Sequence, residues 1–169
     1  MGRRTGEALR EAILEEAFRR VREEGSEAVS MRRLGRHLGY APATIYLYFE
    51  GKQELLAEVA EEGFRRLLAR SLAALDKPDP ARALEEGARA WVAFALEEPH
   101  LYRLMVPGVR PPSGEGAAAR LWARWRDLYA RVAPGCGGAA DPETRVRLAW
   151  SLLHGLVTLA LAPAPPPPG

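Results

Sequence analysis

Two short helical segments separated by a glycine constrain this 169-residue chain more than any other feature. After Ser30, whose hydroxyl we expect to cap a helix, Leu34 and Leu38 lie four residues apart and therefore share one helical face. Gly39 supplies a left-handed stop, and a proline tolerated in a first turn opens a second short helix over residues 43–49. Two short helices joined in this way are typical of the helix-turn-helix, whose second helix enters the DNA major groove.

Helical spacing continues on both sides of this motif. Upstream, an apolar residue at every fourth position predicts a helix from Glu7 to Glu24, which Gly25 ends. We expect this helix to form the hydrophobic floor of the motif, because two short helices bury too little surface to stand alone. Downstream, the pattern predicts one long helix over residues 52–75, about 35 Å long at a rise of about 1.5 Å per residue.

The second half of the chain is also helical and is rich in aromatic residues. Its last predicted helix opens with Asp141 as N-cap and Pro142 in the first turn. From Leu148 onward this helix is apolar nearly all round, which requires burial on more than one side. A second copy of the chain is the simplest cover for the outer side, so we expect a homodimer. The predicted helices of this half span residues 81–97, 100–106, 116–132 and 142–161, and the dimer would form through about residues 117–132 and 142–161.

The motif resembles a known family. From Gly39 to Leu55 the chain reads G-Y-A-P-A-T-I-Y-L-Y-F-E-G-K-Q-E-L, which is similar to the DNA-binding signature of the tetracycline-repressor (TetR) family. Upstream, residues 13–25 resemble the first helix of the same family. There are two departures, since Tyr40 replaces the usual small aliphatic residue and Ala41 replaces the usual serine. Alanine is a poor N-cap, so the contact that the serine would make is lost.

A weaker resemblance covers the second half. The spacing of Trp150, His154 and Gly155 is similar to a regulatory-domain subgroup of the TetR family that is marked by a Trp-His-Gly pattern. The run from Pro99 to Val106 is similar to the same subgroup. These resemblances and the helical pattern together predict an all-α fold, in which a three-helix DNA-binding domain is joined by a long helix to a helical regulatory and dimerisation bundle. The predicted parts are residues 1–51, residues 52–162 and a Pro-rich disordered tail, residues 163–169.

The start of the second short helix should face the bases. Ala41, Pro42 and Ala43 offer no hydrogen bonds there, but they can touch thymine methyl groups. Arg32, in the first turn of the preceding helix, matches a position that the family uses to contact bases, and arginine pairs with guanine through two hydrogen bonds. A contact of Arg32 with phosphate or solvent alone remains equally open.

The resemblance also implies phosphate contacts from the second short helix and from the helix that follows it. Tyr46, Tyr48 and Lys52 match family positions that bind phosphates, and phenol hydroxyls and a lysine at a helix N-terminus suit that role. Core packing is the alternative for the tyrosines, although Ile45 and Phe49 already supply the apolar stripe of this helix. Thr44 matches the motif too, as a phosphate donor or as a hydroxyl that bonds within the helix.

An effector cavity is the natural role for the aromatic residues of the second half, because ligand sites are mostly apolar with a few convergent polar groups. The alternative for each residue singly is core packing, and for His154 it is a hydrogen-bonded place in the core. The candidate pocket residues are Trp91, Phe94, Tyr102, Met105, Trp122, Trp125, Tyr129, Trp150 and His154.

Charge and composition narrow the class of protein. The net charge is only +2, so any nucleic-acid surface must be local; residues 29–52 supply one, with three arginines and a lysine against the single acid Glu50. Cys136 is the only cysteine, which excludes an intrachain disulfide and a cysteine-based zinc site. The sequence contains no carboxylate pair, Ser/His/Asp set or phosphate loop, so we expect no enzyme, cofactor or metal. The absence of a signal peptide or membrane span predicts a cytoplasmic protein with no membrane partner.

These observations lead to two hypotheses. The first is a homodimeric, ligand-responsive transcriptional repressor that binds a palindromic operator in double-stranded DNA and responds to a small apolar or aromatic effector. The second is a DNA-binding regulator without an effector, either an activator or a constitutive binder. Both require the segment from Gly39 to Phe49 to present its second helix to a DNA groove.

Overall fold

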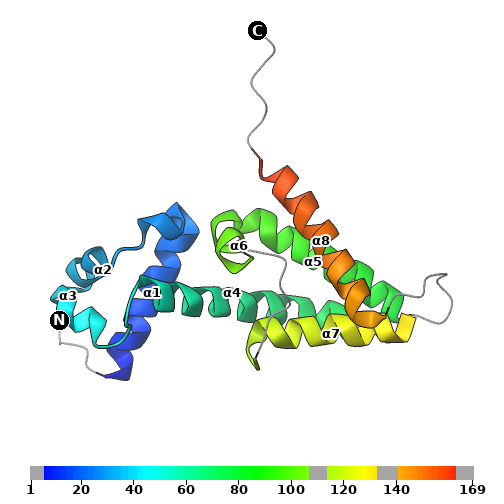
Figure 1. Cartoon of the computed structure of the whole chain (residues 1–169), viewed down its shortest axis with the longest axis horizontal. Coiled ribbons are helices and arrows are strands. Elements are labelled where there is room, and N and C mark those ends of the chain that lie inside the picture. The colour runs from blue at the N-terminus through cyan, green and yellow to red at the C-terminus, as the bar shows by residue number, and fades with distance from the viewer. Residues whose placement is uncertain (1–5, 107–113, 133–140, 163–169) are drawn as a thin grey trace, which may run out of the picture. The chain divides into compact units, whose positions relative to one another are not determined.

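The computed structural model describes residues 6–106, 114–132 and 141–162, and every regular element in these ranges is a helix (Figure 1). This confirms the predicted all-α fold. The predicted tail and Cys136 lie outside the described residues. In chain order the elements are α1 (Glu7–Glu24), the 3-10 helix η1 (Ser26–Ala28), α2 (Met31–Leu38), α3 (Pro42–Tyr46), α4 (Lys52–Leu75), α5 (Pro80–Glu97), α6 (Pro99–Met105), α7 (Ala117–Val132) and α8 (Pro142–Ala160).

The chain forms two compact units. The first comprises Met1–Phe64 with His100–Pro107, and the second comprises Arg65–Pro99 with Gly108–Gly169. Helix α4 begins at Lys52, as the sequence predicts, and contributes its first half to one unit and its second half to the other. Helix α6 belongs to the first unit although it follows α5 in the sequence. The assignment of residues 1–51 and 52–162 to separate functions stays a prediction.

The core of the first unit is built on α1, as expected for the floor of the motif. The side chains that α1 repeats at every fourth position are all buried, and they share the core with buried residues of α2, α3 and α4. At Gly63 of α4 an added Cβ would lie 2.6 Å from Met105 Sδ, so α4 and α6 are in close contact. The buried side chains of this core include Leu9, Ile13, Ala17, Val21, Leu34, Ile45, Phe49, Leu55 and Val59.

The ends of α2 follow the sequence only in part. Gly39 adopts a left-handed conformation with φ 78° and ends α2, as predicted. The predicted cap at Ser30 is wrong in its chemistry, because the Ser30 hydroxyl makes no capping hydrogen bond. Its backbone carbonyl instead accepts a hydrogen bond of 2.9 Å from the amide of Leu34. The next helix, α3, is shorter than the predicted 43–49, since only Pro42–Tyr46 is regular helix and the chain then turns.

The second unit packs α5 against α7 and α8, and α7 against α8. Gly87 of α5 allows a close approach, because an added Cβ would lie 2.7 Å from Leu75 Cδ2 and 3.4 Å from Trp125 Cζ2. Asp141 caps α8 as predicted, since its carboxylate accepts hydrogen bonds from the amide of Thr144 at 3.1 Å and from its hydroxyl at 2.7 Å. Both hydrogen bonds hold the pKa of the Asp141 carboxyl below its usual value.

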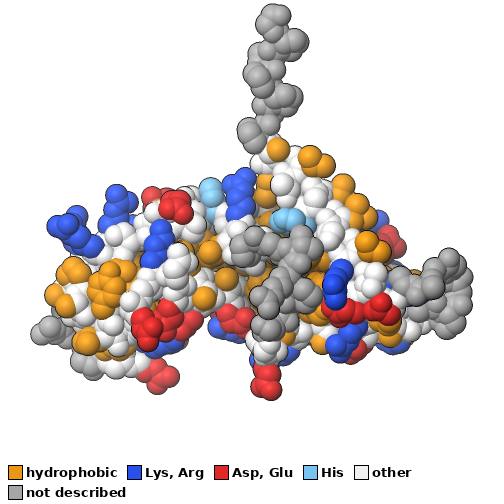
Figure 2. All heavy atoms as spheres, viewed as in Figure 1, with side chains coloured by type: hydrophobic (Ala, Val, Ile, Leu, Met, Phe, Trp, Pro, Cys, Tyr) orange, Lys and Arg blue, Asp and Glu red, His pale blue; other side chains and the backbone are white. Residues whose placement is uncertain are grey.

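Helix α8 buries little of its apolar surface within the described residues. Only Val146 and Val157 of this helix are buried. Four leucines are each more than half exposed, and Figure 2 shows hydrophobic side chains along the outer side of the helix. The spacing of these leucines at four, four and three residues places them on one helical face. They are Leu148, Leu152, Leu156 and Leu159.

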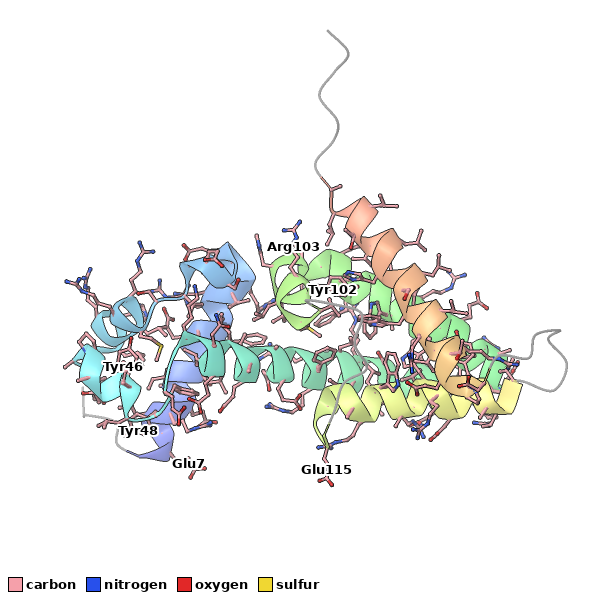
Figure 3. All side chains as sticks on the ribbon, in the orientation of Figure 1. Glu7, Tyr46, Tyr48, Tyr102, Arg103 and Glu115 are labelled. Atoms are coloured by element: carbon pink, nitrogen blue, oxygen red, sulfur yellow. The ribbon has the colours of Figure 1, made fainter. Side chains whose placement is uncertain are left out.

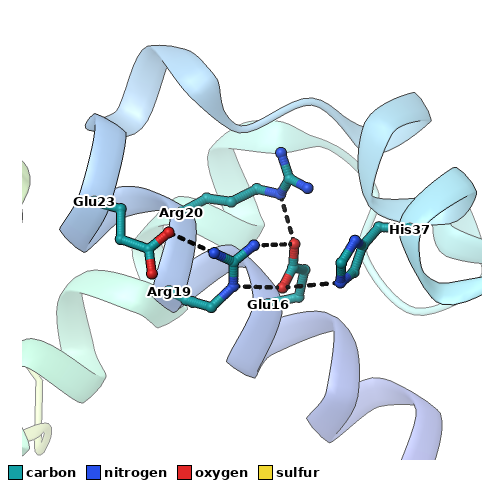
Figure 4. Close-up of polar contacts among 5 residues, drawn as sticks. All are labelled: Glu16, Arg19, Arg20, Glu23 and His37. Carbon is teal, nitrogen blue, oxygen red and sulfur yellow. Dashed lines mark hydrogen bonds and ion pairs between the residues drawn. The ribbon is translucent and has the colours of Figure 1, made fainter.

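A buried carboxylate connects α1 to α2 within the first unit (Figure 4). Glu16 of α1 is only 7% exposed and accepts hydrogen bonds from Arg19 at 2.8 and 2.9 Å and from Arg20 at 2.7 Å. His37, near the end of α2, places its Nε2 atom 3.5 Å from Glu16 Oε2. The hydrogen bond from Arg19 is the main reason that the pKa of the Glu16 carboxyl lies below its usual value, and burial opposes this effect.

Replacing Glu16 with glutamine tests this cluster. Hydrogen bonds to a charged group contribute about 1.5–3 kcal/mol, so we expect Glu16→Gln to lower the free energy of unfolding by that amount at pH 7. A depressed carboxyl pKa stabilises the fold above the unfolded value, here 4.5, and the stabilisation is lost as the pH falls through the folded value. The difference between the two proteins should therefore shrink below pH 4.5 in urea titrations.

Glu23→Gln is the matched control for this experiment. Its exposed carboxylate pairs with Arg19 on the same helix, and exposed ion pairs contribute about 0–1 kcal/mol. If Glu16→Gln proved as stable as the unsubstituted protein at pH 7, the cluster would have no structural role.

Candidate nucleic-acid interface

The predicted DNA-contact residues lie on α2, on α3 with the residues just before and after it, and in the first turn of α4, all in the first unit. Helices α2 and α3 pack against each other, and Figure 3 labels Tyr46 and Tyr48 beside α3. Burial separates the predicted residues into two groups. Arg32, Ala41, Pro42, Ala43 and Tyr46 are exposed, whereas Thr44, Tyr48 and Lys52 are half-buried. Their contacts with DNA stay a prediction.

The outer face of α3 has a residue that sequence reasoning missed. Ile45 and Phe49 are buried, so the opposite side of the helix faces outward. At 100° per residue that side is centred on Ala43 and Leu47, which lie four positions apart. Leu47 is 81% exposed. The sequence could have indicated this exposure, because the apolar stripe of Ile45 and Phe49 leaves Leu47 as well as the tyrosines outside the core.

Three arginines of α2 have no carboxylate partner within the described part of the chain. Arg32, Arg33 and Arg36 are exposed, and Figure 2 shows basic side chains projecting over α2 beside hydrophobic side chains over α3. Elsewhere arginine is typically paired; for example, Arg70 donates to Glu97 at 2.8 Å and Arg89 donates to Glu85 at 2.8 Å. Uncompensated guanidinium groups on one short helix make a surface suited to phosphate.

Tyr48 and Lys52 flank this surface with suitable donors. The Tyr48 hydroxyl accepts a hydrogen bond of 3.2 Å from the amide of Gly6, which leaves the hydroxyl proton available for a phosphate oxygen. Lys52 lies in the first turn of α4, where the helix dipole also favours an anion. Its Nζ atom is 3.7 Å from the carboxylate of Glu27, which is almost fully exposed. Such a pair is weak and would yield to a phosphate group.

The candidate pocket residues do not all belong to one unit. Tyr102 and Met105 are buried on α6 in the first unit, where Met105 lies against Gly63. The other seven belong to the second unit. The predicted set of nine is therefore divided by the fold, and its role as a pocket stays a prediction.

Within the second unit the aromatic residues fall into a buried group and a half-buried group. Trp91, Phe94 and Trp125 are buried. The Nε1 atom of Trp125 is buried without a hydrogen-bond acceptor in the described ranges. Desolvation raises the pKa of the half-buried Tyr129, whose ring centroid lies 6.4 Å from that of Trp125.

The half-buried group joins α7 to α8. Trp150 stacks on His154 at a centroid distance of 5.7 Å, and Trp122 meets Trp150 edge-on at 6.1 Å. The indole N–H of Trp122 donates to the Glu143 carboxylate at 3.2 Å. These contacts give Trp122, Trp150 and His154 a packing role whether or not a ligand binds nearby.

Among the described residues no group of three or more His, Cys, Asp or Glu side chains is arranged to hold a metal ion. No helix in the same ranges combines the length and the apolar character needed to cross a lipid bilayer.

Two family models match the chain, and together they cover most of it. Residues 13–59 match the model of bacterial regulatory proteins of the tetR family. Residues 84–167 match the model of the tetracyclin repressor-like C-terminal domain. The first match contains α2 and α3, and the second contains α7 and α8. The Trp-His-Gly subgroup stays a prediction, because the matching C-terminal model carries only the broader description.

Similar proteins agree with these matches. An uncharacterized HTH-type transcriptional regulator of Bacillus subtilis, YobS, is 27% identical over 150 residues, which cover 87% of this chain and 76% of YobS. A solved protein of unknown function from Rhodococcus sp. RHA1 has a TM-score of 0.74 at 26% identity, covering 96% of this chain and 91% of that one. The TetR-family regulator PfmR of Thermus thermophilus has a TM-score of 0.61 at 28% identity, covering 91% and 88%.

A more distant structure shares the fold alone. AibR, solved in complex with isovaleryl coenzyme A and operator DNA, has a TM-score of 0.61 at 18% identity and covers 88% of this chain and 85% of that one. The two family models, the related regulators and the helix-turn-helix geometry of α2 and α3 agree. The chain therefore belongs to the TetR family of bacterial regulatory proteins and is a DNA-binding transcriptional regulator.

Proposed function

We propose that this regulator is a homodimeric repressor that binds a palindromic operator and responds to a small-molecule effector. The observation that carries the proposal is the surface of α2 and α3, where Arg32, Arg33 and Arg36 have no carboxylate partner among the described residues beside an exposed α3 face. A repressor needs sequence-selective occupancy of an operator. Arg33 and Arg36 would bind phosphate, Arg32 would contact a base edge, and the uncovered face of α3 would enter the groove.

The exposed leucine face of α8 supports the homodimer. Four leucines on one helical face, from Leu148 to Leu159, are uncovered in a single chain, and contiguous apolar faces of this kind mark protein interfaces. A two-fold dimer buries the same face of both copies and presents two recognition helices related by the same axis. Two such helices read half-sites about one helical turn apart, which is why the operator should be palindromic.

The effector response is supported by the second unit and by a structural relative. AibR, which shares this fold, was solved in complex with both isovaleryl coenzyme A and operator DNA. In this chain the buried Trp125 offers an indole N–H without an acceptor in the described ranges, and α4 contributes to both units. A ligand that changes the placement of α4 would alter operator affinity, and a coupling of about 1–3 kcal/mol suffices.

The alternative is a regulator with no effector. It shares every DNA-binding feature and differs only in the second unit. Because a DNA-binding regulator acts on the chromosome, we place either form in the cytoplasm.

Substitutions at Arg32 and Lys52 separate base reading from phosphate binding. After selection of an operator from random duplex DNA, Lys52→Ala should weaken binding to all sequences alike and reduce the slope of log affinity against log salt by about 1. Arg32→Ala should instead relax base preference, at a cost of about 1–3 kcal/mol on the preferred sequence. Fluorescence anisotropy across salt concentrations and operator variants measures both effects. Selection that yields no palindrome would contradict the proposal.

A charge on the exposed face of α8 tests the dimer. We expect Leu152→Glu to produce a folded monomer, because it places a carboxylate at the centre of the proposed apolar interface. Sedimentation velocity gives the oligomeric state, and circular dichroism shows whether the helices persist. Leu96→Glu, on an exposed position of α5, is the matched control and should leave the dimer intact. A Leu152→Glu protein that remains dimeric would place the interface elsewhere.

Thermal-shift screening separates the two proposed functions. A ligand that binds only the folded state at about 100 times its Kd adds about 2.7 kcal/mol, which corresponds to a rise in Tm of about 5–10 °C for a chain of this length. The panel consists of aromatic carboxylic acids, short-chain fatty acids and their coenzyme A thioesters. A compound that raises Tm should also change operator affinity in a gel shift. If no compound of the panel raises Tm, the result favours the effector-free regulator.

A further inference from the structure

We propose that Leu47 is a specificity-determining residue that contacts thymine methyl groups, so that α3 reads its half-site through apolar contacts rather than hydrogen bonds. This inference rests on the proposed operator binding and names the chemistry by which one part of the operator is recognised. It concerns a residue at the end of α3 that the DNA-binding motif does not by itself assign.

The exposure of Leu47 is the first observation. At 81% it is the most exposed large hydrophobic side chain of the described residues. A single exposed leucine is ordinary on a protein surface, but this one has apolar neighbours. Tyr46 is also exposed, and the residues from Ala41 to Ala43 add only methyl and pyrrolidine groups to the same end of the unit. The result is a continuous apolar surface around α3, visible in Figure 2.

The helical geometry directs Leu47 outward. Its backbone angles, φ −72° and ψ −18°, continue the helix one residue past Tyr46. Ile45 is buried, so Leu47 and Ala43 occupy the opposite side of the helix. Side chains on a helix lean toward its N-terminus, so Leu47 extends over Ala43, whose short side chain leaves that space open. The N-terminal end is the end that a recognition helix points at the bases.

The chemistry of the major groove then selects the partner. Base edges there present hydrogen-bond donors and acceptors, and the thymine C5-methyl group is the apolar exception. An apolar side chain placed against any other base edge removes water from a polar group without replacing its hydrogen bond. Ala41, Pro42 and Ala43, at the start of α3, carry no side-chain donor or acceptor that could restore that bond, and the hydroxyl-bearing Thr44 is half-buried. The face is therefore complementary to thymine.

Charge on the neighbouring helix indicates that the occupant is DNA. Arg32, Arg33 and Arg36 lie beside the apolar face without a carboxylate partner in the described ranges. An apolar patch bordered by unpaired cations matches a groove with a methyl group on its floor and phosphates along its edges. A second protein surface would need its own acidic rim to fit the same place.

Replacing thymine with deoxyuridine removes only the methyl group, and it provides the test. In a selected palindromic operator, we expect one or two thymines per half-site at which this replacement lowers the affinity of the unsubstituted protein about 4-fold, the value of one buried methyl-sized group. Replacing the equivalent thymine in both half-sites should lower it about 16-fold, since the two sites are independent. Leu47→Ala should bind the thymine and deoxyuridine operators with affinities within about 1.5-fold of each other.

Leu96→Ala is the matched control, because it truncates another exposed leucine on α5; it should keep the full sensitivity to deoxyuridine. Unchanged thermal melting and sedimentation of Leu47→Ala would show that its fold and oligomeric state are intact. Normal operator binding with no sensitive thymine overturns the inference and leaves the proposed function standing. So does a Leu47→Ala protein that retains the sensitivity, or one whose oligomeric state changes. Failure to select any DNA overturns both.

Discussion

The burial of one side of a five-residue helix is the constraint on which the rest of this structure depends. Helix α3 is too short to persist in water alone, and Ile45 and Phe49 hold it by entering the core that α1 supplies. Because those two positions are committed to the interior, the opposite side must face outward. The proposed reading surface is therefore a consequence of the core, and a substitution that loosened the packing of Ile45 would disturb that surface without changing any of its exposed residues.

The distribution of arginine partners separates scaffold from interface. On α1, Arg19 and Arg20 satisfy the buried carboxylate of Glu16, and their charges are neutralised within the unit. On α2, the three arginines Arg32, Arg33 and Arg36 have no carboxylate partner in the described ranges. The near-neutral total charge of the chain hides this contrast. A protein with so many arginines can thus bind nucleic acid at one place without attracting it everywhere, because local charge rather than total charge decides the encounter.

The sequence predicted most helix boundaries because those boundaries are local. Gly39 and Asp141 act through their own backbone and side-chain geometry, which a sequence displays directly. The predictions differ from the structure at the start of α2 and at the end of α3. The hydroxyl of Ser30 makes no cap although its residue type favours one. The regular part of the second short helix ends at Tyr46, and residues 47–49 continue as a turn whose amides bond to the carbonyls of Thr44 and Ile45.

The residues of the candidate site stay a prediction, and the structure adds one residue to them. Residue type and the family resemblance pointed to arginine, tyrosine, lysine and the apolar start of the second short helix, but not to Leu47. The Glu16 cluster was equally hidden, since the approach of His37 from another helix cannot be read from spacing along α1. Both were found only when burial and distance were known, and both concern residues whose type suggests the opposite environment.

The position of α6 limits how domains of such proteins can be recombined into hybrid regulators. This helix is separated from the DNA-binding motif by all of α5, yet it packs on Gly63 and belongs to the first compact unit. The first unit is thus assembled from two stretches of chain that are discontinuous in the gene. A hybrid regulator made by joining the N-terminal half of this chain to a foreign sensor would lack α6 and so have an incomplete first unit. The foreign chain would have to supply a helix of matching shape at the same place.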